Sequence, residues 1–249
     1  MRSFHFHILL FLSIIFFFAS CEEKENTSHQ KTIYLLSAKS FHIPHPSSAF
    51  EKALIKAGLV DVLLIDTTIV VDMKYSSKDN FLGRDVYGNF NKCYLQKDAA
   101  LKLVNAQKKL KELKPGYSLI VWDAARPRYV QQMMWDTLKL PFKEKIKFLS
   151  NPKYGSNHNF GEAVDVSIVD ENHHLLDMAT TFDFMGEMAY STAEERLLKE
   201  GKLTQEQYDN RKLLHKVMYS AGFYNIQTEW WHYNACTRDE AVKKYKMIE

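Results

Sequence analysis

The sequence lacks a strong excess of charge of either sign, and it also lacks internal repeats. Its formal charge is only +3, from 33 basic and 30 acidic residues, and the lysines are scattered along the chain. Nucleic-acid-binding surfaces usually concentrate basic residues in one patch, so we expect no nucleic-acid partner. No repeat, low-complexity tract or second linker interrupts the chain, which argues against a solenoid or an array of small domains.

Cysteine is also scarce. Apart from Cys21 near the N-terminus, the chain contains only Cys93 and Cys236. An exported protein can oxidise such a pair, but a disulfide requires Cα atoms within about 7 Å of each other. Sequence separation does not reveal that distance. A disulfide and two buried free thiols therefore remain open alternatives.

A long apolar run occurs at the N-terminus. Arg2 is followed by HILLFLSIIFFFAS and then by Cys21. The run is short for a membrane-spanning helix, and small residues precede the cysteine, as is typical of a secretion signal. The segment Ala19-Ser20-Cys21 resembles a bacterial lipoprotein signal, in which the cysteine is lipidated. An ordinary signal peptide and a membrane anchor are the alternatives.

This interpretation divides the chain into three parts. We predict a lipoprotein signal peptide at 1–20, a polar tether at 21–45 and a folded domain at 46–249. The protein would then be an exported lipoprotein, held at a membrane in the periplasm by the lipid on Cys21.

The rest of the chain contains the periodic patterns of a folded domain. Of the whole sequence, 46% is apolar, which is ample for a packed core at this length. Helical spacing and strand-like alternation of apolar residues are both present. The predicted helices are 50–59, 96–113, 128–138 and 204–222, and the predicted strands are 60–66, 69–73, 117–123, 161–169 and 228–234. Together they predict one α+β domain with a central antiparallel sheet flanked by helices.

Two short segments contain residue types that bind metals. In SNHNFGEAVD, His158 lies in a loop and Asp165 lies in the strand that follows. Gly161 between them can adopt the backbone angles of a tight turn. In EWWH, Glu229 and His232 are three residues apart, which places them on opposite faces of a regular strand. A twist or bulge would have to redirect one of them.

Two histidines and one carboxylate form a zinc site with an open fourth position, as in catalytic zinc centres. We therefore predict one Zn²⁺ per chain, bound by His158, Asp165 and His232, with Glu229 as the base that acts on a bound water. A loop histidine is often a surface residue, and an aspartate beside a strand often caps a turn. The joint pattern, and not any single residue, indicates the metal site.

The same segments resemble a known family. SNHNFGEAVD matches the signature S-x-H-x-x-G-x-A-x-D, and EWWH matches E-x-W-H, both found in zinc D-alanyl-D-alanine dipeptidases of the VanX kind. That family is grouped with D,D-carboxypeptidases and the Hedgehog amino-terminal domain, and the resemblance implies their fold. The segments YSSKDNFLGRDVYG, WDAARP and DMATTFDFMGE are similar to further family segments. Ala124-Ala125 replaces the more usual Gly-Tyr, and Ala179 stands where the family usually has glycine.

The resemblance implies roles for further residues. Arg126 would stabilise the negative oxygen of the tetrahedral intermediate, with a structural salt bridge as its alternative role. Asp177 would bind the free ammonium of a dipeptide, and Asp183 is the alternative. Ser156 would either hydrogen-bond the substrate or shape its loop.

The implied activity is zinc-dependent hydrolysis of D-alanyl-D-alanine, or of related small peptides, in cell-wall precursor turnover or recycling. Two alternatives stay open. One is a zinc D,D-carboxypeptidase or endopeptidase that acts on peptidoglycan stem peptides. The other is a zinc-stabilised binding module without catalysis. The retained Glu229 and Arg126 argue against the binding module, because such a module has no need of a residue that activates water.

Overall fold

The structure, a computed structural model, describes residues 49–249. The predicted signal peptide, the tether and Cys21 lie outside the described residues. The helices are α1 (Ala49–Lys56), α2 (Lys97–Leu113), α3 (Arg128–Thr137), α4 (Phe142–Phe148), α5 (Glu194–Lys199), α6 (Gln205–Ser220) and α7 (Arg238–Lys244). The strands are β1 (Val60–Asp61), β2 (Val70–Val71), β3 (Tyr94–Leu95), β4 (Ser118–Asp123), β5 (Ala163–Val169), β6 (Tyr224–Asn225) and β7 (His232–Asn234). Short 3-10 helices include η1 (Val62–Leu64) and η3 (Asn157–Phe160). None of the helices within residues 49–249 is long and apolar enough to span a bilayer.

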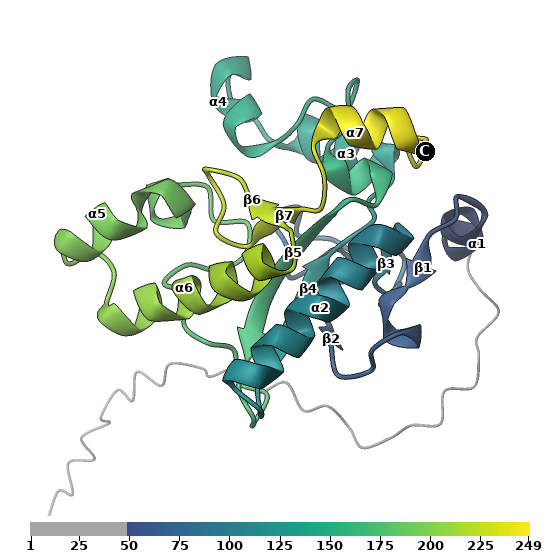
Figure 1. Ribbon diagram of the computed structural model, residues 1–249. Helices are drawn as coiled ribbons and strands as arrows, with labels where there is room; N and C mark the ends of the chain where they lie inside the picture. Colours follow the sequence, from purple (N-terminus) through teal and green to yellow (C-terminus); the bar gives the residue numbers. More distant parts are fainter. Residues whose placement is uncertain (1–48) are drawn as a thin grey trace, which may run out of the picture. The chain divides into compact units, whose positions relative to one another are not determined.

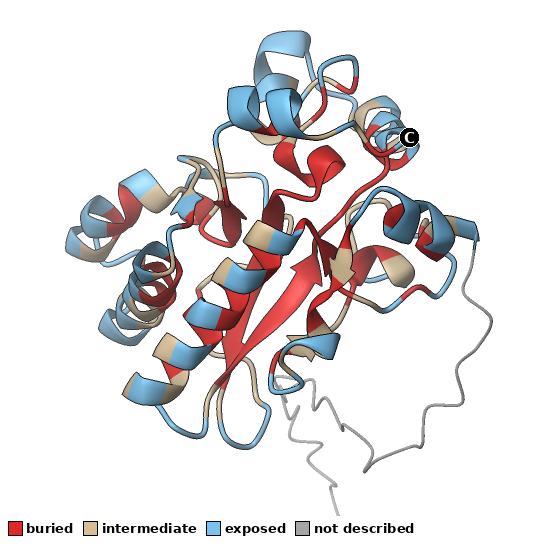
Figure 2. Ribbon diagram, turned by 45° about the vertical axis from the view of Figure 1, so that its right-hand side comes forward, coloured by how far each residue is buried: buried red, intermediate tan, exposed pale blue. Residues whose placement is uncertain are grey.

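A five-stranded sheet with the order β2-β4-β5-β7-β6 lies at the centre of the fold (Figure 1). Strands β4, β5, β7 and β6 pair antiparallel, whereas β2 pairs with β4 in parallel. Every residue of β4 and β5 is buried, so these two strands form the middle of the core (Figure 2). The α+β prediction is confirmed, and one parallel edge pair is added to the antiparallel sheet.

Helices α2 and α6 lie side by side and cover the sheet on one side (Figure 1). The apolar stripe of α2 is buried, as its periodicity predicts. Gln107 of α2 accepts a hydrogen bond from the Leu119 amide at 2.8 Å and joins the helix to β4. Helix α6 begins at Thr204, whose hydroxyl accepts from the Gln207 amide in a capping box. Both long helices therefore form where the sequence predicts them.

The contacts of α6 show which face of the sheet remains for a functional site. His215 of α6 lies 2.5 Å from the Tyr233 hydroxyl, so Tyr233 and its cross-strand partner Val164 point toward α6. Side chains alternate along a strand. Asp165 and its partner His232 therefore point to the opposite face.

Three predicted strands, 60–66, 69–73 and 228–234, are much shorter than their sequence pattern indicates, and 69–73 keeps only Val70–Val71 as strand β2. In 60–66, the Asp61 carboxylate accepts from the Leu63 amide at 3.1 Å and begins η1, which ends strand β1 after two residues. In 228–234, the strand begins only at His232. Glu229 therefore precedes the strand, and the alternation of side chains along a strand does not apply to it. No twist or bulge is needed to bring Glu229 to the same side as His232.

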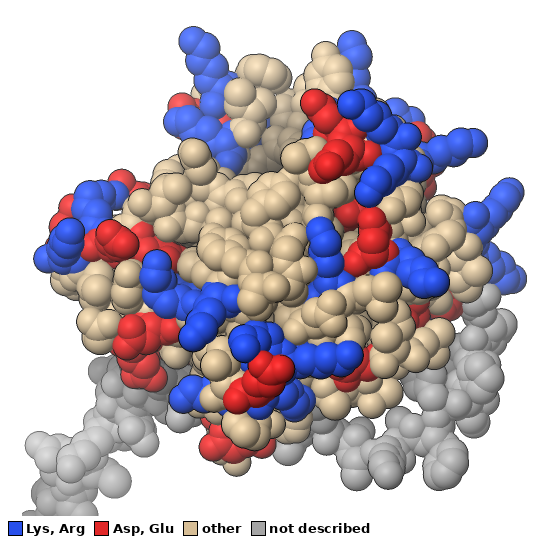
Figure 3. Space-filling view, in the orientation of Figure 1, with Lys and Arg blue, Asp and Glu red and all other residues tan. Residues whose placement is uncertain are grey.

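The surface carries charges of both signs, and Lys and Arg alternate with Asp and Glu on the face shown in Figure 3. Cys93 and Cys236, whose pairing the sequence left open, are both free thiols. Cys93 is buried, and Cys236 is partly exposed.

A buried carboxyl group lies just before β5. The Glu162 side chain is fully buried and lies against Asp98 of α2 and the thiol of Cys236. Burial, and then the neighbouring Asp98, raise the pKa of Glu162 to about 7. In its protonated form, Glu162 can donate a hydrogen bond to Asp98, which also accepts from the Tyr245 hydroxyl at 3.0 Å.

We expect Glu162→Gln to stabilise the protein at pH 8 much more than at pH 5. The pKa of Glu162 is about 7 in the folded chain, against 4.5 as its ordinary value. Between these values the folded state holds a proton that the unfolded chain releases, so stability falls as the pH rises. Glutamine keeps a donor toward Asp98 at every pH. The difference in free energy of unfolding between the variant and the wild type should shift in favour of the variant by about 2–3 kcal/mol between pH 5 and pH 8.

Urea unfolding at both pH values measures this effect. Glu195→Gln, at an exposed position of α5, serves as the control and should show no such shift. If the free energies of unfolding of Glu162→Gln and the wild type differed equally at pH 5 and pH 8, Glu162 would keep its ordinary pKa in the folded chain.

Candidate active site

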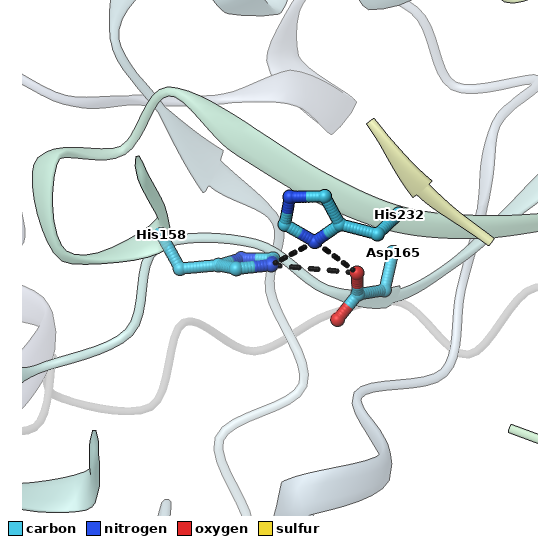
Figure 4. A group of neighbouring side chains, drawn as sticks. All are labelled: His158, Asp165 and His232. Atoms are coloured by element: carbon cyan, nitrogen blue, oxygen red, sulfur yellow. Dashed lines mark hydrogen bonds and ion pairs between the residues drawn. The ribbon is translucent and has the colours of Figure 1, made fainter. Parts of the chain in front are cut away.

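His158, Asp165 and His232 converge from three separate segments (Figure 4). His158 belongs to η3, Asp165 to β5, and His232 begins β7 as the direct cross-strand partner of Asp165. The distance from His232 Nδ1 to Asp165 Oδ1 is 3.0 Å, and His158 Nε2 lies 3.1 Å from His232 Nδ1 and 3.3 Å from Asp165 Oδ1. All three side chains are buried. The predicted ligands are therefore brought together.

Gly161 is the residue that allows His158 to turn back over β5. Its φ is +71°, and it ends η3. A Cβ at this position would lie 2.9 Å from the Leu59 side chain. Only glycine adopts this left-handed conformation readily and leaves that space free. The turn expected from the sequence is confirmed.

Hydrogen bonds behind the ligands fix the position of the imidazole protons. His158 Nδ1 lies 2.7 Å from the Ala124 carbonyl oxygen, and His232 Nε2 lies 3.1 Å from the Asn234 amide oxygen. Both oxygens only accept, so these two nitrogens carry the protons. The lone pairs of His158 Nε2 and His232 Nδ1 therefore face each other and the Asp165 carboxylate with no proton between them.

Three converging lone pairs repel one another unless a cation lies between them. A tetrahedral ion with ligand distances of about 2.0–2.1 Å places its ligand atoms about 3.3 Å apart, close to the observed spacing. Two imidazoles and one carboxylate are a donor set that zinc accepts. The residues present therefore fit a zinc ion.

Arg126 supplies a fixed cation beside the ligands. Its Nε and Nη2 donate to Asp123 Oδ2 at 2.8 and 2.6 Å, Nη1 donates to Gln131 at 2.9 Å, and Nη2 lies 3.6 Å from Asp165 Oδ2. These hydrogen bonds use three of the five N–H groups of a guanidinium, and Arg126 lines the cavity. Burial alone would lower the pKa of Arg126, but Asp123 and other neighbours raise it well above its ordinary value. Arg126 thus forms a buried salt bridge and still faces the cavity.

Glu229 approaches the ligands from the segment before β7. Its Oε2 lies 3.9 Å from His232 Nδ1, and its side chain lines the cavity. Burial raises the pKa of Glu229 to about 8, against the opposing effect of His232. Its position beside the ligands would let this carboxyl group accept a proton from a bound water and return it.

The cavity beside the ligands has a volume of about 270 Å³, and a second acid lies in its wall. Asp183 accepts from the Tyr75 hydroxyl at 2.9 Å. Burial, followed by the charge of Asp165, raises the pKa of Asp183 to about 7. Trp231 also lines this cavity, whereas Trp230 is fully buried in the core.

The structure does not bring Asp177 to the site. Asp177 is exposed and does not line the cavity. Its carboxylate accepts from the Ala179 amide at 2.8 Å and from Gln207 Nε2 at 2.9 Å. These contacts use Asp177 as a turn residue and leave it outside the cavity, whereas Asp183, the alternative, lines it.

Ser156 lines the cavity, but its polar atoms serve its own loop. Its amide donates to Asn159 Oδ1 at 2.7 Å, and its hydroxyl donates to the same atom at 3.3 Å. The Asn159 side chain also donates to the Arg126 carbonyl at 2.7 Å. Of the two roles expected for Ser156, these contacts support shaping the loop.

Comparisons with known proteins agree with this geometry. The profile of the D-ala-D-ala dipeptidase family, Peptidase_M15, matches residues 55–247. The chain belongs to this family. A D-alanyl-D-alanine dipeptidase of Escherichia coli (strain K12) is 31% identical over 175 residues, which cover 70% of this chain and 83% of that protein. One from Enterococcus faecalis (strain ATCC 700802 / V583) is 30% identical over 177 residues, which cover 65% of this chain and 83% of that protein.

Among solved structures, the LdcB LD-carboxypeptidase aligns with a TM-score of 0.35 and 20% identity, over 61% of this chain and 70% of that chain. The family resemblance found from the sequence motifs is confirmed by the family match, and the protein is a hydrolase of a metallopeptidase family.

Sequence reasoning did not identify Asp123 and Tyr75 as members of the site. Asp123 is the cross-strand partner of Asp165 and binds Arg126. The segment WDAARP could have indicated Asp123, because in it an aspartate ends a buried strand three residues before the arginine. Tyr75 is the first residue of the family-like segment YSSKDNFLGRDVYG, but that segment does not indicate its partner Asp183, which lies 108 residues away.

Proposed function

We propose that this protein hydrolyses D-alanyl-D-alanine, or closely related dipeptides with a free amine, at a zinc ion held by His158, Asp165 and His232. The observation that carries this proposal is that Asp183 lines the same small cavity as the ligand cluster. A carboxylate so placed can bind a substrate ammonium only a short distance from the bond that is cut. The names of the relatives support the same substrate.

The residues of the cavity divide the chemistry among them. Bound zinc supplies a Lewis acid and lowers the pKa of a water molecule toward neutrality. Glu229 accepts the proton of the attacking water and returns it to the leaving amine. The free N–H groups of Arg126 stabilise the carbonyl oxygen as it becomes negative. Tyr75 holds Asp183 toward the substrate ammonium.

Three substrates test this proposal on the zinc-loaded protein. Free D-Ala-D-Ala should exceed N-acetyl-D-Ala-D-Ala in kcat/KM by about a hundredfold, because the acetyl group removes the cation and leaves a buried carboxylate unpaired, a loss of about 3 kcal/mol. A pentapeptide ending in D-Ala-D-Ala should also be a poor substrate. Equal rates on the free and acetylated dipeptides would favour a carboxypeptidase, and no turnover of any substrate would favour a binding module.

We also propose that the protein is exported and held at a membrane in the periplasm through lipid on Cys21. The support is the sequence of residues 1–21 alone. In that place it would meet dipeptides released by cell-wall turnover. Cell fractionation checks this, since Cys21→Ser should detach the protein from the membrane or leave its signal uncleaved, and a wild-type protein found entirely in the soluble fraction would contradict it.

A further inference from the structure

The loop from Met178 to Met188 carries Asp183 into the cavity, and its backbone is strained. Ala179 has a φ of +71° and Asp183 a φ of +61°. Side chains with a Cβ disfavour this left-handed conformation, and alanine gains nothing locally from adopting it. Such conformations persist where the surrounding structure enforces them. Contacts from outside the loop must therefore hold it.

Arg211 of α6 provides three of these contacts, in addition to those of Tyr75 with Asp183 and of Asp177 with Ala179. The Arg211 side chain is fully buried. Its Nε and Nη2 donate to the Met178 carbonyl at 2.9 and 2.6 Å, and Nη2 also donates to the Met188 carbonyl at 2.8 Å. One planar guanidinium thus joins the two ends of the loop, which the single nitrogen of a lysine cannot do in the same geometry.

The charge of Arg211 is balanced by a buried network behind β7. Its Nη1 lies 3.7 Å from Glu194 Oε1. Glu194 lies 3.0 Å from His215 Nε2, and His215 Nδ1 lies 2.5 Å from the Tyr233 hydroxyl. Burial lowers the pKa of Arg211 to about 10, so it remains a cation at neutral pH. This network lies on the face of the sheet opposite to the metal ligands.

The same cation also contacts the segment that carries the base. The Arg211 guanidinium lies 5.6 Å from the centre of the Trp230 ring, and Trp230 directly follows Glu229. Trp230 Nε1 in turn donates to the Thr180 hydroxyl at 2.7 Å. Arg211 and Trp230 therefore tie the loop of Asp183 to the segment of Glu229.

We infer that Arg211 is a positioning residue that holds the Met178–Met188 loop so that Asp183 faces the substrate ammonium, and that it thereby sets the preference for a free N-terminal amine. Arg211 does not line the cavity, so it acts through Asp183. The inference rests on the proposed function for the identity of its substrate.

Arg211→Lys tests the inference on the zinc-loaded protein, with Lys216→Met at an exposed position of the same helix as the control. The kcat/KM ratio of free to N-acetylated D-Ala-D-Ala should fall about tenfold or more in Arg211→Lys, mainly through KM for the free dipeptide. Zinc content and the rate on the acetylated dipeptide should change little. The ratio of the control should equal that of the wild type.

A double variant separates positioning from general loss of structure. Asp183→Asn alone should lower the same ratio by about a hundredfold. Adding Arg211→Lys should lower it no further, because both changes act on the same interaction, that of Asp183 with the substrate ammonium. Equal losses on both substrates, or additive effects in the double variant, would overturn the inference. If Arg211→Lys does not fold, Thr180→Val, which removes only the acceptor of Trp230, should move the ratio in the same direction, and an unchanged ratio would overturn it.

Hydrogen exchange gives a readout that does not depend on the substrate. Amides within 178–188 should exchange faster in Arg211→Lys than in the wild type, while those of β5 keep their protection. Unchanged exchange in the loop would refute the role of Arg211 whatever the substrate. A wild-type protein without preference for the free amine would instead refute the proposed function, and the exchange result would still decide whether Arg211 holds the loop.

Discussion

Glu229→Gln is expected to lower the turnover of D-Ala-D-Ala by about 10²–10⁴, the usual contribution of general acid–base catalysis. Glutamine keeps the shape and polarity of the side chain but cannot accept the proton of the attacking water. Glu229 lies 3.9 Å from His232 Nδ1 and is not one of the three converging ligand residues. The variant should therefore keep its metal, at about one zinc per chain.

His232→Ala is the contrasting variant, because it removes a ligand and leaves two. Zinc content and turnover should fall together in this variant. Atomic absorption and a D-Ala-D-Ala assay on the same preparations measure both quantities. Nearly full activity in Glu229→Gln would make Glu229 a structural residue. Loss of zinc in that variant would make it a ligand, and the ligand set would have to be revised.

Arg126→Met is expected to lower kcat for D-Ala-D-Ala by about 10²–10³, with a smaller change in KM. Arg126 lines the cavity, and two of its five N–H groups are not used in its hydrogen bonds to Asp123 and Gln131. Their interaction with a substrate carbonyl oxygen would strengthen only as that oxygen becomes negative. An effect on kcat therefore distinguishes this role from simple substrate binding. Steady-state kinetics on the zinc-loaded protein measures it.

Arg126 also neutralises the buried Asp123, so removing it has a structural effect. Arg126→Lys keeps a cation near Asp123 but loses the fork that reaches both the aspartate and the cavity. It should be folded and zinc-loaded in thermal unfolding and metal analysis, yet still be slow. A lysine variant with wild-type kcat would show that Arg126 is needed only for its salt bridge with Asp123.

The features that the sequence determined by itself depend on neighbours along the chain. Helices α2 and α6 follow from their apolar spacing, and α6 also from the capping box at Thr204, because helical contacts join residues three and four positions apart. The link between His158 and Asp165 is local in the same sense, since Gly161 alone permits the turn between them. Residue types and spacing were therefore sufficient to find the metal ligands and the family.

The tertiary structure decided the features that depend on contacts between distant segments. Asp177 and Asp183 stand in one short stretch of similar composition, and which of them enters the cavity depends on the path of a loop held by Arg211, 33 residues beyond Met178. The sequence likewise did not show where the Glu229 side chain points, because that depends on where β7 begins to pair with β5. Strand pairing and loop path are fixed by burial and hydrogen bonds that form only when the chain closes on itself. The pattern of neighbouring residues carries no information on these contacts. The sequence therefore predicted the metal site but not the substrate end of the cavity.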